Sequence, residues 1–240
     1  MGNPALNVLI TGGAGVLGRK IAEDLLAKGH GVFVLDKAMA KTTGQAAEFI
    51  RCDLGNQDDL SACFNELITR AGRVDVLINC ASVRQFKMLA DFTPTEIRQN
   101  IQVDFIAPVI LANLCLPRME KNNFGRIINI SSISAYSGFS TGSLYCSSKN
   151  ALITLGESLG KELKKTNGSV TINTICPGSF SKTDGTTLQS FPRITGSIVD
   201  TVDRIIHSGM NGRVINIFSF QNKLMESLRF LLKAFQMIIS

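Results

Sequence analysis

A glycine-rich turn near the N-terminus joins an apolar run at residues 7–10 to a segment whose apolar residues have helical spacing. Glycine allows the backbone to turn sharply and to approach a bound phosphate closely. The N-terminus of the helix that follows offers unpaired N–H groups and a partial positive charge. This order of run, turn and helix predicts a βαβ unit that binds a dinucleotide through its pyrophosphate. The predicted contact residues are Gly12, Gly13, Gly15, Val16, Leu17 and Gly18.

Apolar runs alternate with helical patterns along the rest of the chain. Further strands are predicted at residues 32–35, 48–52, 74–79, 126–131, 170–175 and 213–218, and helices at 59–71, 95–121 and 145–166. Continuous Val, Ile and Leu runs between helices are typical of parallel strands that are buried on both faces. We predict an α/β fold with a Rossmann-like, doubly wound parallel sheet of about seven strands and helices on both faces.

The length of 240 residues suits a single domain over residues 1–240. Residues 178–197 are rich in Ser, Thr and Gly, and we expect them to form a loop over the substrate. Residues 223–239 have apolar positions at helical spacing, which predicts a C-terminal amphipathic helix. Packing on its own domain or on a sister subunit is the favoured role for that helix, and peripheral membrane contact is a less favoured one.

Charge and cysteine content exclude several classes of protein. The net charge is +6, but the basic residues are scattered, whereas nucleic-acid binding usually requires clusters of them. The six cysteines form no CxxC pair and have no metal-ligand spacing with the two histidines, so we expect reduced thiols and no metal site. The sequence shows no signal-peptide pattern and no run of about 20 uncharged apolar residues, and we expect a cytoplasmic protein.

Two acidic residues follow predicted strands on the side where a dinucleotide would bind. Asp36 ends the second run, and its carboxylate is suited to both hydroxyls of an adenosine ribose. The same charge would repel a 2′-phosphate, so Asp36 favours NAD over NADP, although Lys37 is its neighbour. Asp53, after the third run, is placed to reach the adenine amino group.

Tyr145 and Lys149 lie four residues apart and therefore on one face of a predicted helix. Tyrosine ionises at about pH 10 in water, and a neighbouring cation favours the ionised form. Such a phenol can pass a proton to or from a substrate oxygen.

Taken together, these motifs resemble the short-chain dehydrogenase/reductase family over roughly residues 5 to 218. The resemblance rests on the Thr11 to Gly18 turn, Asp53-Leu54, Asn79-Cys80-Ala81-Ser82, Tyr145 with Lys149, Ser132 at 13 residues before Tyr145, and Pro177-Gly178. It implies that Leu54, Asn79, Ala81, Pro177 and Gly178 join the cofactor-binding set, with Tyr145 and Lys149.

The resemblance also implies a function, namely hydride transfer between a nicotinamide cofactor, NAD(H), and an alcohol or ketone. Tyr145 would be the general acid or base, Lys149 would hold the nicotinamide ribose and favour the ionised phenol, and Ser132 would orient the substrate oxygen. The implied partners are a small alcohol or carbonyl substrate and further copies of the chain in a homodimer or homotetramer.

The sequence departs from the family pattern at Asp104, where an asparagine is usual. A carboxylate there could still anchor water near Lys149, so Asp104 stays in the predicted catalytic set. Its negative charge would oppose ionisation of the phenol, which predicts a more alkaline pH optimum or reduced activity.

Two alternative functions follow from the other departures. The GxxGxxG spacing that starts at Gly12 is more typical of nucleotide-sugar epimerases, dehydratases and reductases of the family's extended branch. Asp104 and the C-terminal segment at residues 223–239 would also suit a cofactor-binding sensor or scaffold with weak catalysis.

Overall fold

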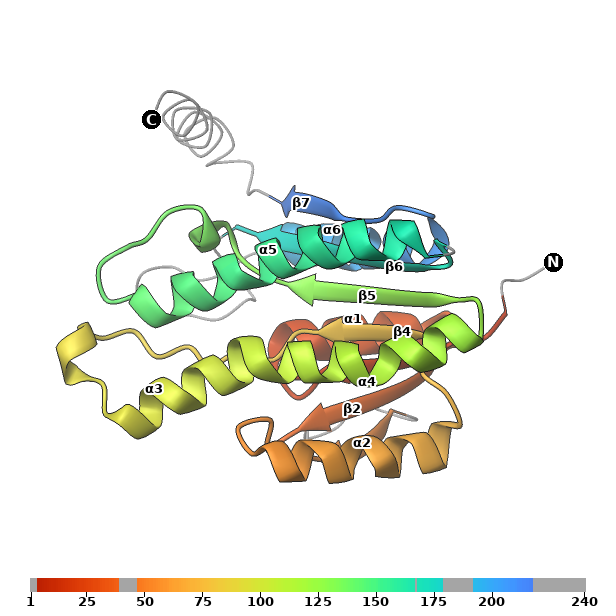
Figure 1. Ribbon diagram of the computed structural model, residues 1–240, viewed down its shortest axis with the longest axis horizontal. Coiled ribbons are helices and arrows are strands. Elements are labelled where there is room, and N and C mark those ends of the chain that lie inside the picture. The colour runs from red at the N-terminus through yellow and green to blue at the C-terminus, as the bar shows by residue number, and fades with distance from the viewer. Residues whose placement is uncertain (1–3, 39–46, 167, 179–191, 218–240) are drawn as a thin grey trace.

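The computed structural model describes residues 4–38, 47–166, 168–178 and 192–217 (Figure 1). They form one seven-stranded sheet in the order β3-β2-β1-β4-β5-β6-β7, in which every neighbouring pair is parallel. The strands are β1 Asn7–Thr11, β2 Gly31–Asp36, β3 Glu48–Arg51, β4 Val76–Asn79, β5 Gly125–Ile130, β6 Val170–Pro177 and β7 Arg213–Ile217. This confirms the predicted doubly wound parallel sheet and its seven strands.

Helices cover both faces of the sheet (Figure 1). They are α1 Val16–Ala27, α2 Gln57–Ala71, α3 Pro94–Ile101, α4 Ala107–Lys121, α5 Ser143–Lys165 and α6 Pro192–His207. One core joins α2, α4 and α5 to side chains such as Leu9 and Leu77, and the other joins α1 and α6 to Ile10 and Ile78. Neighbouring residues of one strand thus enter opposite cores, as the pleat of a β-strand requires.

The strand order reverses between β1 and β4, and this point positions the site. Thr11 and Asn79 are partners at the last paired position of these two strands. In open α/β sheets, ligands bind at the carboxyl ends of the strands beside such a reversal. The glycine turn after β1 and the segment after β4 both start there.

The structure corrects the predicted helix at residues 95–121. A π-helical turn, η2 at Gln102–Ile106, separates α3 from α4. A π turn contains an extra residue in the helix, and such turns are frequent at functional sites. Asp104 lies inside this one.

The structure also corrects the end of the predicted loop at residues 178–197, because α6 begins at Pro192. The apolar side chains of Ile198, Val202 and Ile205 have helical spacing and are buried against the sheet, so the helix is stabilised by that packing. Residues 179–191 and the predicted C-terminal helix at 223–239 lie outside the described residues.

The segment Pro94–Lys121 is long and apolar enough to cross a membrane by length and composition alone. Leu111, Cys115 and Met119 on this segment have no exposed surface and pack in the core against the sheet. Its apolar character is therefore that of a core helix in a globular domain.

Candidate active site

The glycine turn after β1 fits closely against the segment after β4. Gly12 has a φ of 72°, and a Cβ added there would lie 2.6 Å from Cα of Ala81. A Cβ at Gly13 would lie 2.6 Å from Cγ1 of Val34, and one at Gly18 would overlap the carbonyl oxygen of Gly12. Side chains are therefore excluded at these three positions for steric reasons.

The N-terminus of α1 is suited to a phosphate group. Gly15 is its N-cap, no side chain caps it, and its first turn contains no acidic residue. The first N–H groups of a helix have no partner within the helix and carry a partial positive charge. With the glycine turn beside it, this end of α1 fits the pyrophosphate of a dinucleotide.

Asp36 stands beside the glycine turn. Its Oδ2 accepts a hydrogen bond from the Ala14 N–H at 2.9 Å, and its Oδ1 accepts one from the Ala38 N–H at 3.0 Å. The end of β2 thus places a carboxylate directly at the turn, where the sequence predicted the adenosine ribose.

Asp53 lies on the far side of β2, after β3. Its Oδ2 pairs with Nζ of Lys37 at 3.0 Å, and its Oδ1 accepts the Gly55 N–H at 3.0 Å. The bond from Lys37, followed by the Gly55 N–H, lowers the pKa of this carboxyl. The ammonium of Lys37 is thereby bound to Asp53.

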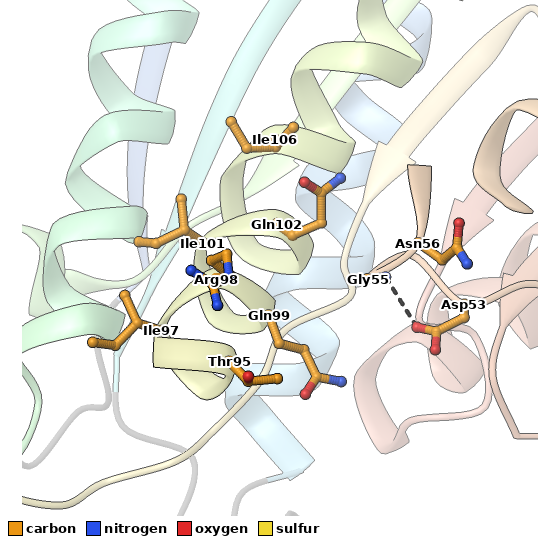
Figure 2. Close-up of a pocket in the computed structure, with 10 residues that line it drawn as sticks. All are labelled: Asp53, Gly55, Asn56, Thr95, Ile97, Arg98, Gln99, Ile101, Gln102 and Ile106. Carbon is orange, nitrogen blue, oxygen red and sulfur yellow. Dashed lines mark hydrogen bonds between the residues drawn. The ribbon is translucent and has the colours of Figure 1, made fainter. Parts of the chain in front are cut away.

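A groove with a volume of about 640 Å³ lies beside Asp53, between the loop after β3 and the helices α3 and η2 (Figure 2). It is lined by Asp53, Gly55, Asn56, Thr95, Ile97, Arg98, Gln99, Ile101, Gln102 and Ile106. Of the predicted site residues in the described chain, only Asp53 lines it. The groove therefore adjoins the predicted adenine-side residue Asp53.

Thr11 holds the two loops of the site together, a role that the sequence did not predict. It is 2% exposed, and its Oγ1 accepts hydrogen bonds from the N–H groups of Cys80 and Ala81 at 3.1 and 3.2 Å. The only available signal was a polar residue at the end of an otherwise apolar strand.

Asn79 is paired with a second asparagine that was not predicted. Its Nδ2 donates to Oδ1 of Asn129 at 2.9 Å, and the two residues are register partners on β4 and β5. The Asn79 Oδ1 is buried and accepts no hydrogen bond from the described residues. A buried amide oxygen of this kind needs a donor, which a bound ligand or water can supply.

The remaining predicted cofactor residues have different environments. Leu54 is buried in the same core as the apolar side chains of α2. Val16 is 39% exposed at the start of α1, whereas Leu17 packs partly into the core. Pro177 ends β6, and the Gly178 N–H donates to the carbonyl of Ile217 at 2.6 Å.

Tyr145 and Lys149 share one face of α5, as predicted. The Nζ of Lys149 lies 5.8 Å from the centre of the Tyr145 ring. Lys149 is 3% exposed, and its ammonium donates to the carbonyl of Ile130 at 3.0 Å. A buried ammonium, held by the end of β5, therefore stands beside the half-buried phenol.

Tyr136, the other tyrosine of the chain, has a different environment. Its hydroxyl donates to Oδ1 of Asn216 at 3.1 Å, and burial raises its pKa. Tyr136 therefore holds its proton more firmly than a free phenol does.

Ser132 follows β5 and caps the short helix η3, Ile133–Ala135. Its Oγ accepts the Ser134 N–H at 3.1 Å, which leaves the hydroxyl proton available to a substrate oxygen. The neighbouring Ser131 instead donates to the carbonyl of Lys149 at 2.7 Å. Of these adjacent serines, Ser131 fixes α5 against β5.

Asp104 holds the segment after β4. Its Oδ1 accepts the Val83 N–H, and its Oδ2 accepts the Ser82 hydroxyl, at 2.6 and 3.1 Å. The side chain is 1% exposed, and burial raises the pKa of the carboxyl, while the charge of Lys149 and the two hydrogen bonds oppose that rise. Asp104 is thus electrostatically linked to Lys149.

Replacing Asp104 with asparagine tests the effect of this buried carboxyl. A carboxyl whose pKa is raised by folding binds more protons in the native state, so the free energy of unfolding falls as pH rises from about 4 through the raised pKa. Asparagine does not titrate and can still accept the Val83 N–H. In thermal melts, we expect Asp104→Asn to have a Tm roughly 2–4 °C above the wild type at pH 8, with no difference below about pH 4.

The same variant tests the predicted effect of Asp104 on catalysis. Loss of one negative charge near Lys149 favours the ionised phenol, so the pH–rate profile should move to lower pH. An unmoved profile, measured with the same substrate, would contradict this role.

The structure brings together three potential metal ligands that are not grouped in the sequence analysis. The ligand atoms of Cys52, Asp59 and Cys63 lie within 4.8 Å of one another. Burial raises the pKa of both thiols, and Cys63 donates to the carbonyl of Arg51 at 3.3 Å. A thiol binds a metal as the thiolate, and burial disfavours that form here. The expected absence of a metal site is consistent with this but stays a prediction.

The chain as a whole can be compared with known proteins. Residues 6–191 match the short chain dehydrogenase family. The chain belongs to this family. It is therefore an oxidoreductase of alcohol and carbonyl groups that uses a nicotinamide cofactor.

Individual family members are similar over most of their length. Ketoacyl reductase HetN of Nostoc sp. is 30% identical over 239 residues, covering 95% of this chain and 83% of the relative. Carbonyl reductase family member 4 of Xenopus tropicalis is 29% identical, covering 74% and 76%. A short chain dehydrogenase structure from Leptospira borgpetersenii with bound NAD⁺ has a TM-score of 0.77 at 22% identity, covering 89% and 91%.

Proposed function

We propose that this family member interconverts ketones and secondary alcohols, prefers NAD(H) to NADP(H), and uses Tyr145 as its general acid and base. The observation that carries the proposal is the Tyr145 ring with the Lys149 ammonium 5.8 Å from its centre, on the helix that follows Ser132. The glycine turn and the N-terminus of α1 lie at the same carboxyl edge of the sheet.

A nicotinamide held over the glycine turn would supply the hydride for reduction of the carbonyl carbon. Tyr145 donates its phenolic proton to the carbonyl oxygen, and the Lys149 ammonium stabilises the phenolate that remains. Ser132 donates its hydroxyl proton in a hydrogen bond to the same oxygen and fixes its position. In the direction of oxidation, the phenolate takes the proton of the alcohol.

The burial of Lys149 strengthens its effect on the phenol. Charges interact more strongly where water is excluded, and this ammonium is 3% exposed. The Ile130 carbonyl fixes its position before substrate binds, so little reorganisation is needed during proton transfer.

The preference for NAD(H) is supported by Asp36. The 2′-phosphate of NADP would meet this carboxylate at the ribose position, and apposition of like charges costs several kcal/mol. Lys37, the nearest basic neighbour in sequence, is bound to Asp53. A dinucleotide without the 2′-phosphate therefore suits this end of β2.

Replacing Asp36 with asparagine tests the cofactor preference. The wild-type kcat/KM should be about 100-fold higher with NADH than with NADPH, and Asp36→Asn should reduce the ratio to below about 10 because the charge is lost. Asparagine retains an oxygen for the Ala14 N–H. The control Asp200→Ser, at an exposed position of α6, should leave the ratio unchanged. A wild-type preference for NADPH would contradict the proposal.

The homodimer or homotetramer remains a prediction, with the helical segments at residues 95–121 and 145–166 as its proposed interface. The cytoplasmic location also remains a proposal, supported by six cysteines that are all free thiols in the structure.

A further inference from the structure

Exposed apolar side chains are concentrated on the loop after β4 and on the loop before α5. Five large hydrophobic residues are exposed in the described part of the chain, and one of them, Val16, lies at the glycine turn. The other four are Phe86, Met88, Leu89 and Phe139, with exposed fractions of 41%, 58%, 57% and 44%. We call these four residues the apolar entrance. Exposed apolar side chains that occur together, rather than singly, indicate a binding surface.

The two phenylalanines form a continuous row of rings with Tyr145. The ring centre of Phe86 lies 5.5 Å from that of Tyr145, at an interplanar angle of 84°. On its other side, Phe86 lies 5.6 Å from Phe139 at 62°. Both are edge-to-face contacts, which are favourable geometries for aromatic pairs. The row leads from an exposed ring to the proposed acid and base.

Backbone contacts fix the two segments of the apolar entrance against each other. The Lys87 N–H donates to the carbonyl of Thr141 at 3.1 Å, and Thr141 has a φ of 69°, an uncommon value for a residue with a side chain. Phe139 packs over Gly142, where an added Cβ would lie 2.5 Å from the ring. The loop after β4 and the loop before α5 are therefore held together by specific contacts.

Two basic side chains lie near the apolar entrance, and one of them is neutralised by an ion pair. The Lys87 ammonium bonds to both oxygens of Glu96 at 2.8 and 2.9 Å, so this pair adds no net charge. These bonds, with those from Thr93, lower the pKa of Glu96 to about 2, so it is ionised whenever the enzyme is folded at ordinary pH. The Arg84 guanidinium lies 5.7 Å from the centre of the Phe86 ring and packs against that ring.

We propose that the apolar entrance binds a bulky aromatic or alkyl group of the substrate, so that the enzyme selects ketones and secondary alcohols with such a group over sugars and other polyols. This inference rests on the proposed function, because it places the reacting oxygen at Tyr145. Phe86 is the specificity-determining residue, since its ring contacts Tyr145 directly.

A matched pair of ketones tests the selectivity. The compounds 4-phenyl-2-butanone and 4-hydroxy-2-butanone share one carbonyl and differ in a phenyl or a hydroxyl group on C4. Burial of the phenyl group should make kcat/KM at least about 10-fold higher for the phenyl compound. Phe86→Ser should reduce this ratio to about 3 or less, while Phe86→Leu, which keeps an apolar side chain, should retain most of it.

Controls keep this test independent of folding and of the proposed chemistry. Both Phe86 variants should bind NADH with the wild-type Kd. If Phe86→Ser fails to fold, Phe139→Ser, at a more exposed ring, should reduce the ratio in the same direction. A wild-type ratio of one or less, or an unchanged ratio in the folded serine variants, would overturn the inference.

Tyr145→Phe distinguishes the two proposals. If this variant stays active, the proposed acid and base is wrong. If it is inactive but the wild-type enzyme shows no preference for the phenyl compound, only the apolar entrance is refuted.

Discussion

Replacing Tyr145 with phenylalanine is expected to lower kcat by about three orders of magnitude and to leave the Kd for NADH within about twofold of the wild type. The phenylalanine ring retains the edge-to-face contact with Phe86, so the local packing is preserved. Only the hydroxyl that exchanges a proton with the substrate is lost, and a positioned acid or base contributes about 10²–10⁴ in rate. Steady-state kinetics and a fluorescence titration with NADH measure the two quantities separately.

The chain has an internal control for this experiment, because Tyr136 is its second tyrosine. Its hydroxyl donates a hydrogen bond to Asn216. Tyr136→Phe should therefore keep kcat within a few-fold of the wild type, although it should lose some stability with the hydrogen bond. Equal losses of kcat in the two variants would mean that the tyrosine hydroxyls act through the fold and not through proton transfer.

Replacing Gly18 with alanine is expected to have the second largest effect. The new methyl group would overlap the carbonyl of Gly12, which is backbone and cannot rotate away. Overpacking of this kind costs roughly 1–3 kcal/mol, or about 2–10 °C in Tm for a domain of this size. The turn must also move, so the Kd for NADH should rise by at least about 10-fold.

Gly196→Ala is the matched control for Gly18→Ala. Gly196 lies in α6, and an added Cβ there meets no atom within 4 Å. Alanine is favoured over glycine in helices by about 1 kcal/mol, so this variant should be equally or more stable and should bind NADH normally. Unchanged NADH binding in Gly18→Ala would show that the dinucleotide does not depend on this turn.

The sheet and much of the candidate site could be predicted because their signals are local in the sequence. Apolar runs between helical patterns gave the seven strands in the right order along the chain, and parallel pairing with right-handed crossovers restricts how they can assemble. Tyr145 and Lys149 face the same way because they lie one helical turn apart. The predicted places of Asp36 and Ser132 follow from their positions at strand ends.

Features that depend on contacts distant in the sequence were not predictable. The π turn at Asp104 does not interrupt the apolar pattern of residues 95–121, so nothing in the spacing marks it. The bonds of Thr11 to Cys80 and Ala81 exist because β1 and β4 are neighbours. Phe86 and Phe139 meet only because both loops cross the carboxyl ends of the strands. The start of α6 was missed because its first residues have a loop-like composition.

A crystal structure of the enzyme with bound NADH is the most direct test of the central claim, that Tyr145 acts beside a nicotinamide seated over the glycine turn. We expect the pyrophosphate at the N-terminus of α1 and the nicotinamide C4 separated from the Tyr145 hydroxyl by the space of one substrate carbonyl, with reacting atoms about 3–3.5 Å apart. A nicotinamide ring bound on another side of the sheet, with Tyr145 out of reach of any substrate atom at C4, would contradict the mechanism.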